Sequence, residues 1–303
     1  MKVVAVVLSY NSKDYIGECL ESLLKLETGP HSLEVVVVDN DSTDGSVKFL
    51  SQKYPQIHLI RNPANMGYAG GNNTGFIYAL DSQADFVWLV NPDVTVAPDS
   101  LLKFMEGAAK HTREGIFGCK VFFAPGHETH PERYTKDQLG KVIWYAGGLM
   151  DWRNVYGFHR GVDQVDGEQF NFDTETDYVS GACMFIKRSV LEEVGLLDPR
   201  LFLYYEENDF CQRAKRGGFK CVYLCQPTAW HKNAQATGLG SPLQDYFIIR
   251  NRLFFGLRYA PLYTKQALLR ESWRLYQTGR PWQKKGVVDF YTGRFGAGSY
   301  QPD

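Results

Sequence analysis

The sequence predicts an α/β fold with a Rossmann-like, mostly parallel central sheet flanked by helices. Residues 3–9 and 35–38 are almost wholly apolar, the second run being four valines, and such short runs are typical of strands buried on both faces. Between them an apolar helix face is predicted, with members spaced three and four residues apart: Ile16, Cys19, Leu20, Leu23 and Leu24. Because strand and helix patterns continue to alternate, we expect parallel strands joined by right-handed crossovers.

The first 115 residues continue this alternation. Ser42 is placed to cap a helix over residues 46–52. A helix over residues 73–80 follows a glycine-rich segment, where the glycines would let the backbone approach a ligand closely, although a tight turn before a capped helix would explain them as well. The other elements predicted here are strands at 58–60 and 85–90 and a helix at 98–111.

The pattern after residue 115 is less regular. Residues 143–161 carry several aromatic residues around glycines, which predicts a hairpin whose rings either pack internally or form a platform for a sugar. The other elements predicted here are strands at 116–123, 176–187, 201–205 and 220–224, and helices at 189–194, at 243–259 and from the acidic cluster after residue 205 to residue 216.

Composition narrows the class of protein. The 303 residues are 44% hydrophobic and 22% charged, which is typical of a globular chain, and the net charge of −1 argues against a nucleic-acid binder that uses a strongly basic surface. None of the six cysteines forms a CxxC pair, so we expect buried free thiols and a reducing compartment. With no signal-peptide pattern and no run of roughly 20 apolar residues, a cytoplasmic protein is expected.

Polar side chains follow three of the predicted strands. Tyr10 and Asn11 follow the first strand, Asp39 ends the second, and Asp93 closes the Asn-Pro-Asp sequence after the strand at 85–90. The carboxyl ends of parallel strands meet at one edge of the sheet, so these groups can converge on one crevice. The convergence predicts a nucleotide and metal site, although Asp39 alone could simply help to cap the next helix.

Two further groups could complete such a site. Glu206 and Glu207 follow an apolar, aromatic run, and an apolar setting raises a carboxyl pKa into the range of a general base. An acidic cluster that begins a helix also has a structural explanation, since Asp209 is placed to pair with Arg213 one turn later. His231 and Asp93 together would suit Mn or another divalent ion.

These motifs occur in the order found in family 2 glycosyltransferases, which the chain resembles over about residues 1–260. The matching segments are VVLSYN, VVVVDNDSTDGS, NMGYAGGNNTG, the strand-ending NPD, EENDFCQR and WHK. In detail the chain resembles the rhamnosyltransferase-like branch, which builds bacterial polysaccharides. The resemblance implies a GT-A fold with a nucleotide-binding half at 1–115, an acceptor and catalytic half at 116–260, and a C-terminal helical extension at 261–303.

The resemblance also implies roles for individual residues. Glu207 matches the usual general base, although the pair Glu206-Glu207 leaves open which of the two acts. Asp93 and His231 would hold Mg or Mn at the diphosphate. The residues implied to hold the nucleotide and its sugar are Ser9, Tyr10, Asn11, Asp39, Asn65, Gly67, Asn72 and Asn91, and those implied to contact the acceptor or the diphosphate are Asp209, Arg250 and Asn251.

The implied activity is metal-dependent, inverting transfer of a sugar from dTDP-rhamnose or a UDP-hexose to a glycan or lipid-linked glycan, in polysaccharide, cell-wall or O-antigen biosynthesis. A sugar nucleotidyltransferase and a non-catalytic nucleotide-sugar-binding module are the alternatives. The aromatic and basic segment at 273–300 could contact the inner face of the membrane peripherally, contact a second subunit in a homodimer, or form a packed helical tail. No nucleic-acid partner is expected.

Overall fold

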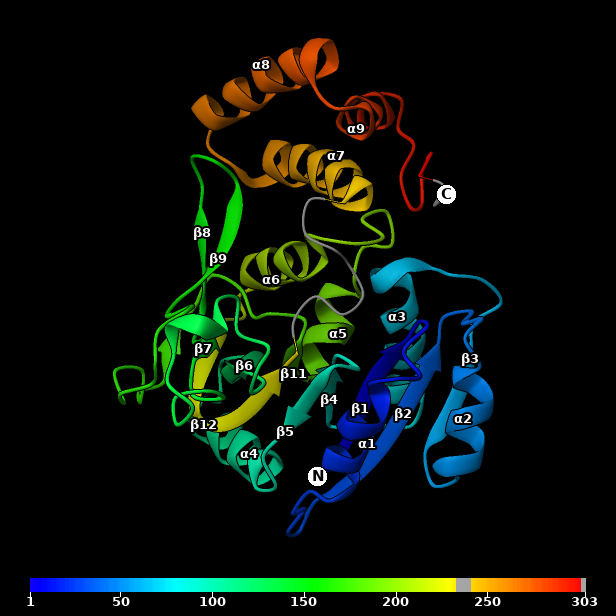
Figure 1. The fold of residues 1–303 in the computed structure, drawn as a ribbon, viewed down its shortest axis with the longest axis vertical. Helices are drawn as coiled ribbons and strands as arrows, with labels where there is room; N and C mark the ends of the chain where they lie inside the picture. Colours follow the sequence, from blue (N-terminus) through cyan, green and yellow to red (C-terminus); the bar gives the residue numbers. More distant parts are fainter. Residues whose placement is uncertain (233–240, 301–303) are drawn as a thin grey trace.

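A computed structural model describes residues 1–232 and 241–300 (Figure 1). Within these residues one ten-stranded sheet has its main strands in the order β10-β12-β6-β11-β4-β1-β2-β3, while β5 pairs with β12 and β7 with β6. Its first part is β1 (Lys2–Ser9), α1 (Ile16–Leu24), β2 (Ser32–Asp39), α2 (Ser46–Lys53), β3 (His58–Arg61), α3 (Gly67–Asp81), β4 (Phe86–Val90), β5 (Val94–Val96), α4 (Ser100–Lys110) and β6 (Ile116–Phe123).

The second part of the chain adds strands, a hairpin and the C-terminal helices. It comprises η1 (Pro131–Arg133), β7 (Ile143–Tyr145), β8 (Gly148–Asp151), β9 (Tyr156–His159), β10 (Thr174–Glu175), β11 (Cys183–Lys187), α5 (Arg188–Val194), α6 (Glu206–Arg216), β12 (Cys221–His231), α7 (Pro242–Tyr259), α8 (Leu262–Thr278) and α9 (Pro281–Tyr291). The hairpin predicted from the aromatic segment is β8–β9.

The prediction of a mostly parallel α/β sheet is confirmed. Strands β1 to β4 pair in parallel and β12 is parallel to β6, whereas β11 runs antiparallel between β4 and β6. Because side chains alternate along each strand, Val3, Ala5 and Val7 pack with α1, α2 and α4, while Val4 and Val6 pack with α3, α5 and α6 on the other face. The sheet is therefore the middle of three layers.

Helix α3 begins six residues earlier than predicted, because the glycine-rich segment is itself helical. Val6 side-chain atoms lie 2.3 Å from where a Cβ on Gly75 would be, and Leu8 atoms lie 2.5 Å from the equivalent position on Gly71. Both glycines therefore allow α3 to pack closely on β1, rather than bringing backbone to a ligand. Gly67, at the start of the helix, has a φ of +70° and does face the site described below.

Two other local predictions are wrong. Ser42 does not cap α2: Gly45 is the N-cap residue, and the Asp44 carboxylate accepts bonds from the backbone N–H and hydroxyl of Ser46 instead. Residues 201–205 do not form a strand but a turn in which Phe202, Tyr204 and Tyr205 all have a positive φ. The strand predicted at 176–187 is also shorter, since regular pairing in β11 covers only Cys183–Lys187.

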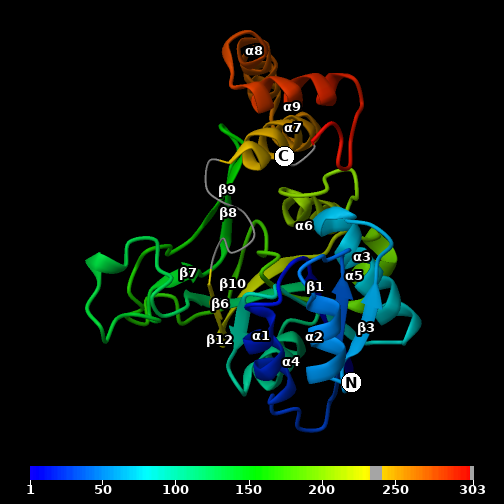
Figure 2. The same cartoon turned by 45° about the vertical axis from the view of Figure 1, so that its right-hand side comes forward.

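The C-terminal helices are stacked at one end of the long axis. Helix α7 packs against both α8 and α9, and the two views agree that α8 and α9 lie beyond it, away from the sheet (Figures 1 and 2). All six cysteines are free, and five of them are buried, as predicted. Across the described ranges, no helix is both long and apolar enough to cross a bilayer.

Candidate active site

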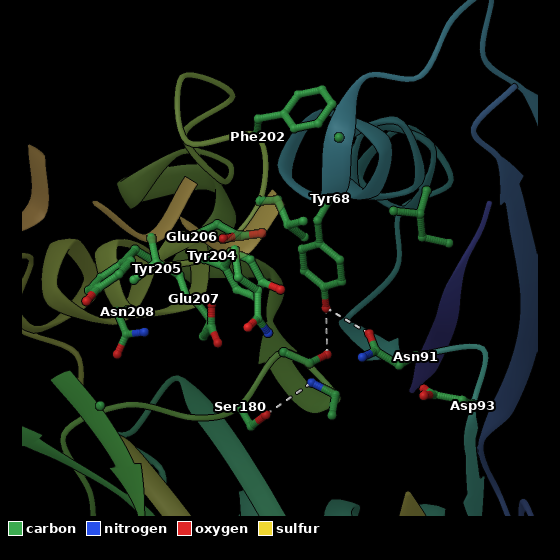
Figure 3. A pocket seen from close by; sticks show the side chains of 18 of the residues that line it. Tyr68, Asn91, Asp93, Ser180, Phe202, Tyr204, Tyr205, Glu206, Glu207 and Asn208 are labelled. Carbon is green, nitrogen blue, oxygen red and sulfur yellow. Dashed lines mark hydrogen bonds between the residues drawn. The ribbon is translucent and has the colours of Figure 1, made fainter. Parts of the chain in front are cut away.

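A cavity of about 570 Å³ opens where the ends of the central strands face α6 and α7. The first part of the chain contributes residues that follow β1, β2 and β4, and α6 and α7 contribute further lining residues. Figure 3 shows Asn91 and Asp93 on one side of the cavity and Glu206 and Glu207 on the other. The residues of the sequence prediction that line the cavity are Tyr10, Asn65, Gly67, Asn91, Asp93, Glu206, Glu207 and His231. The site is thus built from both parts of the chain.

Asp93 and His231 come together through strand pairing. Asp93 immediately precedes β5, and the antiparallel register of β5 with β12 places His231 opposite Val94. The His231 Nε2 lies 3.1 Å from Asp93 Oδ1. The other ring nitrogen, Nδ1, is buried and has no hydrogen-bond partner among the described residues. The Trp144 ring lies edge-on at 4.4 Å from the imidazole.

Glu206 and Glu207 form the first turn of α6, but their surroundings differ. Glu206 is 2% exposed, and its Oε2 has no hydrogen-bond partner in the described structure. Burial, together with the neighbouring charge of Glu207, raises the pKa of Glu206 well above its usual value. Glu207 is only half-buried, and burial raises its pKa as well. Both carboxyl groups therefore hold a proton more tightly than a carboxyl in water does.

Tyr68 projects into the cavity between the two walls (Figure 3). Its hydroxyl lies 3.0 Å from Asn91 Oδ1 and 2.8 Å from the Gly181 carbonyl oxygen. Burial and the nearby Glu207, Glu206 and Asp93 keep the pKa of Tyr68 well above its usual value, so its hydroxyl stays protonated. Tyr68 belongs to the motif segment NMGYAGGNNTG, but it is not among the site residues predicted from the sequence.

The turn before α6 is held by the Arg250-Asn251 pair of α7. The Asn251 side-chain amide donates to the carbonyls of Leu201, Leu203 and Tyr204 at 2.7 to 2.9 Å. The guanidinium of Arg250 donates to the carbonyls of Leu201, at 3.0 Å, and Gly296, at 2.7 Å. Both side chains are completely buried outside the cavity lining, so their contacts shape the turn that precedes Glu206.

Asp209 also lies outside the lining. It is completely buried, and its carboxylate pairs with Arg213 at 2.7 Å and Arg258 at 3.1 Å and accepts the Tyr259 hydroxyl at 2.7 Å. The pair with Arg213 is the one predicted from their four-residue spacing. Asp209 therefore ties α6 to the end of α7.

Four other predicted site residues lie outside the lining: Ser9, Asn11, Asp39 and Asn72. Asp39 accepts the backbone N–H of Ser42 at Oδ2, while its Oδ1 is buried and has no partner among the described residues. Asn11 accepts the backbone N–H of Thr43, which joins the loops after β1 and β2. Ser9 bonds to Ser12, and Asn72 donates to the carbonyl of Tyr68 inside α3.

Aromatic residues complete the cavity wall, and most were not selected from the sequence as site residues. The lining includes Trp144, Tyr156 and His159 from the β7–β9 region, and Tyr178, Ser180 and Tyr204. Burial lowers the pKa of His159 to about 4, so this imidazole is neutral near pH 7. The aromatic run at 143–161 is the sequence signal for this wall, and Trp144 and Tyr156 from that run line the cavity.

Comparisons with known proteins agree with this architecture. The family whose model matches the chain is "Glycosyl transferase family 2", over residues 4–195. An N-acetylglucosaminyl-diphospho-decaprenol L-rhamnosyltransferase of Mycobacterium tuberculosis is 27% identical over 243 residues, 77% of this chain and 76% of the relative. The low-salt glycan biosynthesis hexosyltransferase Agl10 of Haloferax volcanii is 30% identical over 222 residues, 72% of this chain and 66% of the relative.

Solved structures share the fold at lower identity. The mannosyltransferase PcManGT from Pyrobaculum calidifontis, in complex with GDP-Man and Mn2+, has a TM-score of 0.57 at 17% identity. The match covers 98% of this chain and 76% of the PcManGT chain. GalNAc-T7 with UDP, GalNAc and Mn2+ has a TM-score of 0.61 at 13% identity, and the match covers 96% of this chain and 57% of GalNAc-T7. The chain has the GT-A fold and belongs to glycosyl transferase family 2, with rhamnosyltransferases among its relatives.

Proposed function

We propose that this glycosyltransferase moves a sugar from a nucleoside-diphosphate donor to a hydroxyl of a glycan or lipid-linked glycan, with inversion at the anomeric carbon and with a divalent cation. The observation that carries the proposal is one cavity holding Glu207, a half-buried carboxyl with a raised pKa, together with the Asp93–His231 pair. A general base with a pKa closer to the working pH accepts a proton more effectively than an ordinary carboxylate.

Glu207 is the better candidate for the base. Glu206 is almost fully buried, and the charge of Glu207 adds to burial in favouring its protonated form. A carboxyl in that state cannot take a proton from an acceptor. Glu207 is more accessible and faces the same cavity.

Asp93 and His231 fit a divalent cation. They offer a carboxylate and an imidazole at the edge of the cavity, and the buried Nδ1 of His231 has no hydrogen-bond partner among the described residues. No group of three or more His, Cys, Asp or Glu that could hold a metal occurs among the described residues. Two protein ligands suit a cation whose other positions are taken by substrate phosphates and water. Such a cation would neutralise charge on the leaving diphosphate.

The chain's own residues then support a single displacement. Glu207 takes the proton of the acceptor hydroxyl onto a carboxylate oxygen. The acceptor oxygen forms a bond to the anomeric carbon, while the bond from that carbon to the diphosphate oxygen breaks and its electron pair leaves with the nucleoside diphosphate. Attack opposite the leaving group inverts the anomeric configuration, and no second carboxylate is needed to form a covalent sugar intermediate.

We propose dTDP-rhamnose as the first donor to test and UDP-hexoses as the second. The Mycobacterium relative is named as an L-rhamnosyltransferase acting at a diphospho-decaprenol-linked N-acetylglucosamine, and the Haloferax relative as a hexosyltransferase. Tyr10, which lines the cavity, and the neighbouring strand-end residues Asn11 and Asp39 are proposed for the nucleotide. In support, the buried Oδ1 of Asp39 has no hydrogen-bond partner among the described residues.

Calorimetry with dTDP and UDP, each with and without Mn²⁺, tests the proposal. We expect binding that strengthens at least tenfold with Mn²⁺, and we expect Asp93→Ala to remove most of that gain. Asp99→Ala is the matched control, because Asp99 lies six residues further on and pairs with Lys103 outside the cavity. Nucleotide binding that ignores Mn²⁺ would contradict the cation. Absence of transfer and hydrolysis with every sugar nucleotide would favour a non-catalytic binding module.

A further inference from the structure

The outer face of α8 carries a stripe of large apolar side chains that no other part of the described chain covers. Leu262, Leu269, Trp273 and Tyr276 are spaced seven, four and three residues apart, which places them on one side of the helix. Trp273 is 62% exposed and Leu262 is 72% exposed. The inner face is buried through Thr264, Leu268 and Ser272. An exposed apolar stripe of this kind marks an interaction surface.

Positive charge accompanies this stripe. Residues 261–300 contain seven Lys or Arg and two Asp or Glu, whereas the whole chain has a net charge of −1. Both acids are engaged inside the protein: Glu271 pairs with Arg252, and Asp289 is buried against Tyr246. The rest of the chain therefore has a net negative charge, and the excess of positive charge belongs to residues 261–300. These residues include α8 and α9, which lie at one end of the molecule (Figures 1 and 2).

Two arginines beside the stripe are available to a partner. Arg270 and Arg274 lie one turn apart, are exposed, and form no ion pair with any described residue. Arg280, at the start of α9, is by contrast already paired with Asp245. The α8 surface, defined as Leu262, Leu269, Trp273 and Tyr276 with Arg270 and Arg274, thus combines apolar and aromatic contacts with unpaired cations.

We propose that the α8 surface binds an anionic lipid bilayer, with the helix lying in the plane of the interface. Aromatic and leucine side chains on one face with basic side chains beside them are the pattern of an interfacial helix, and tryptophan and tyrosine favour the headgroup level. Basic residues near the surface are attracted by anionic headgroups. A second copy of this chain fits less well, because a two-fold contact through the same face would place Arg270 and Arg274 of both copies in one interface, while the one acid of α8, Glu271, already pairs with Arg252.

Docking through α8 would also orient the cavity. Helix α7 packs on α8 and contributes Leu243, Gln244 and Ile248 to the cavity wall, so the site lies on the other side of α7 from the α8 surface. An acceptor anchored in the same bilayer would then present its sugar from a fixed direction. This consequence rests on the proposed function, whereas the binding of lipid does not.

Flotation of the full chain with vesicles tests the surface. We expect the chain to float with vesicles of phosphatidylcholine and phosphatidylglycerol in a 70:30 ratio, about tenfold less with phosphatidylcholine alone, and about tenfold less at 1 M NaCl, because salt screens the headgroup charge. Trp273→Ser and the double variant Arg270→Glu/Arg274→Glu should each reduce flotation at least fivefold.

Matched control variants lie on other faces of the molecule. Ile77→Ser removes an apolar side chain of α3 that is 50% exposed, and Arg133→Glu/Lys136→Glu reverses two exposed charges in the loop around η1. Both should float as the parent does.

Tryptophan fluorescence gives a second measurement of lipid binding. Trp273 is the one exposed tryptophan of the six, all of which lie among the described residues. Anionic vesicles should therefore shift the fluorescence to the blue in the parent and not in Trp273→Phe.

Three outcomes would overturn the proposal: no flotation with anionic vesicles, equal loss in the control variants, or a dimer in sedimentation velocity that Trp273→Ser dissociates, which would assign the face to a second copy. Nucleotide calorimetry on the same samples separates the two proposals. A chain that floats but does not bind nucleotide refutes the proposed function and leaves the α8 surface standing.

Discussion

Glu206 and Glu207 are adjacent in the sequence, yet the first turn of α6 gives them different environments. The Glu206 side chain is almost completely removed from solvent and one of its oxygens has no partner among the described residues, while Glu207 remains half-buried at the cavity. For both carboxyl groups the largest cause of the raised pKa is burial. The difference in accessibility decides which group can meet an acceptor hydroxyl.

Glu207→Gln should therefore lower kcat by about 10²- to 10⁴-fold while the affinity for the nucleotide stays within about twofold, because the amide keeps the size of the side chain but cannot take a proton. In the parent enzyme, kcat/KM should rise with pH as Glu207 ionises. Since its pKa is raised, this limb should lie above the usual glutamate value of about 4.3. Initial rates across pH, with calorimetry of the nucleotide, provide the measurement.

Glu206→Gln and Glu193→Gln are the matched controls for this variant. Glu193 is exposed on α5, so its change should leave the rate unaltered. Glu206→Gln should keep kcat within about tenfold of the parent, since Glu206 is expected to be protonated already. A larger loss in Glu206→Gln than in Glu207→Gln would reverse the assignment of the base.

The raised pKa of Glu206 also predicts how stability changes with pH. The folded state binds the Glu206 proton more tightly than the unfolded state does, and this difference stabilises the folded protein. The stabilisation is complete at a pH below the pKa of Glu206 in the unfolded chain. It is lost as the pH rises through the higher pKa that Glu206 has in the folded protein. Glu206→Gln cannot ionise, so its free energy of unfolding relative to the parent should increase as the pH rises above the usual glutamate pKa of about 4.3. Urea unfolding at each pH measures this difference, and a constant difference would contradict the prediction.

At the scale of elements, the turn at residues 201–205 connects the two walls of the cavity. Phe202, Tyr204 and Tyr205 have φ values of +64°, +70° and +74°, a region that side chains with a Cβ rarely adopt. The Phe202 carbonyl accepts the backbone N–H of Tyr68 in α3, while Asn251 of α7 binds three carbonyls of the same turn. Contacts from two helices thus hold a strained backbone directly before Glu206.

Asn251→Ala should destabilise the fold by about 2 to 4 kcal/mol, because it removes the buried side-chain amide that donates to three carbonyls of the turn. It should also lower kcat more than it changes KM for the donor, since the turn positions Glu207. Asn154→Ala is the control: Asn154 is exposed and bonds only locally to Asp151 through its side chain, so a loss within about 0.5 kcal/mol is expected. Urea unfolding of both variants measures the loss of stability, and steady-state kinetics measures kcat and the KM for the donor.

Local sequence predicted the elements whose stability comes from their own composition. The valines of β1 and β2 and the apolar face of α1 need only burial to form a strand or a helix, and they were predicted correctly. The turn at 201–205 was not predicted, because the side chains of Leu-Phe-Leu-Tyr-Tyr favour a strand. Only the hydrogen bonds of this segment to α3 and α7 impose the positive φ values. Similarly, the glycines of α3 could not be attributed to packing until their neighbours on β1 were known.

The sequence identifies those residues of the candidate site that directly follow a strand or belong to a recognisable motif. Asp93 and His231 were proposed as partners from their chemistry, and the β5–β12 register brings them to 3.1 Å. Tyr68, Trp144 and Tyr178 could not be chosen in this way, since a buried aromatic side chain has the same local pattern in a core and in a cavity wall. The resemblance implies that Arg250 and Asn251 contact the acceptor or the diphosphate, and only the fold reveals that both side chains bond to the backbone of the 201–205 turn.

At the scale of the whole molecule, the C-terminal helices are joined to the site through α7. Gly286 of α9 is close enough to α7 that a Cβ would lie 2.7 Å from the Tyr246 carbonyl oxygen. The buried carboxylate of Asp289 accepts bonds from the Tyr246 hydroxyl and from the backbone N–H of Ser299. Because α7 also lines the cavity and carries Arg250 and Asn251, α9 supports the helix that shapes the turn before Glu206.

Asp289→Ala should therefore lower the free energy of unfolding of the whole chain by about 2 to 4 kcal/mol, since it removes the buried carboxylate that accepts both the Tyr246 hydroxyl and the Ser299 N–H. If α9 folds together with the sheet, far-UV circular dichroism and tryptophan fluorescence should report one coincident transition at lower urea. Asp81→Ala, at the exposed end of α3, should stay within about 0.5 kcal/mol of the parent. A separate early transition in Asp289→Ala would mean that residues 261–300 unfold on their own and that the sheet does not depend on them.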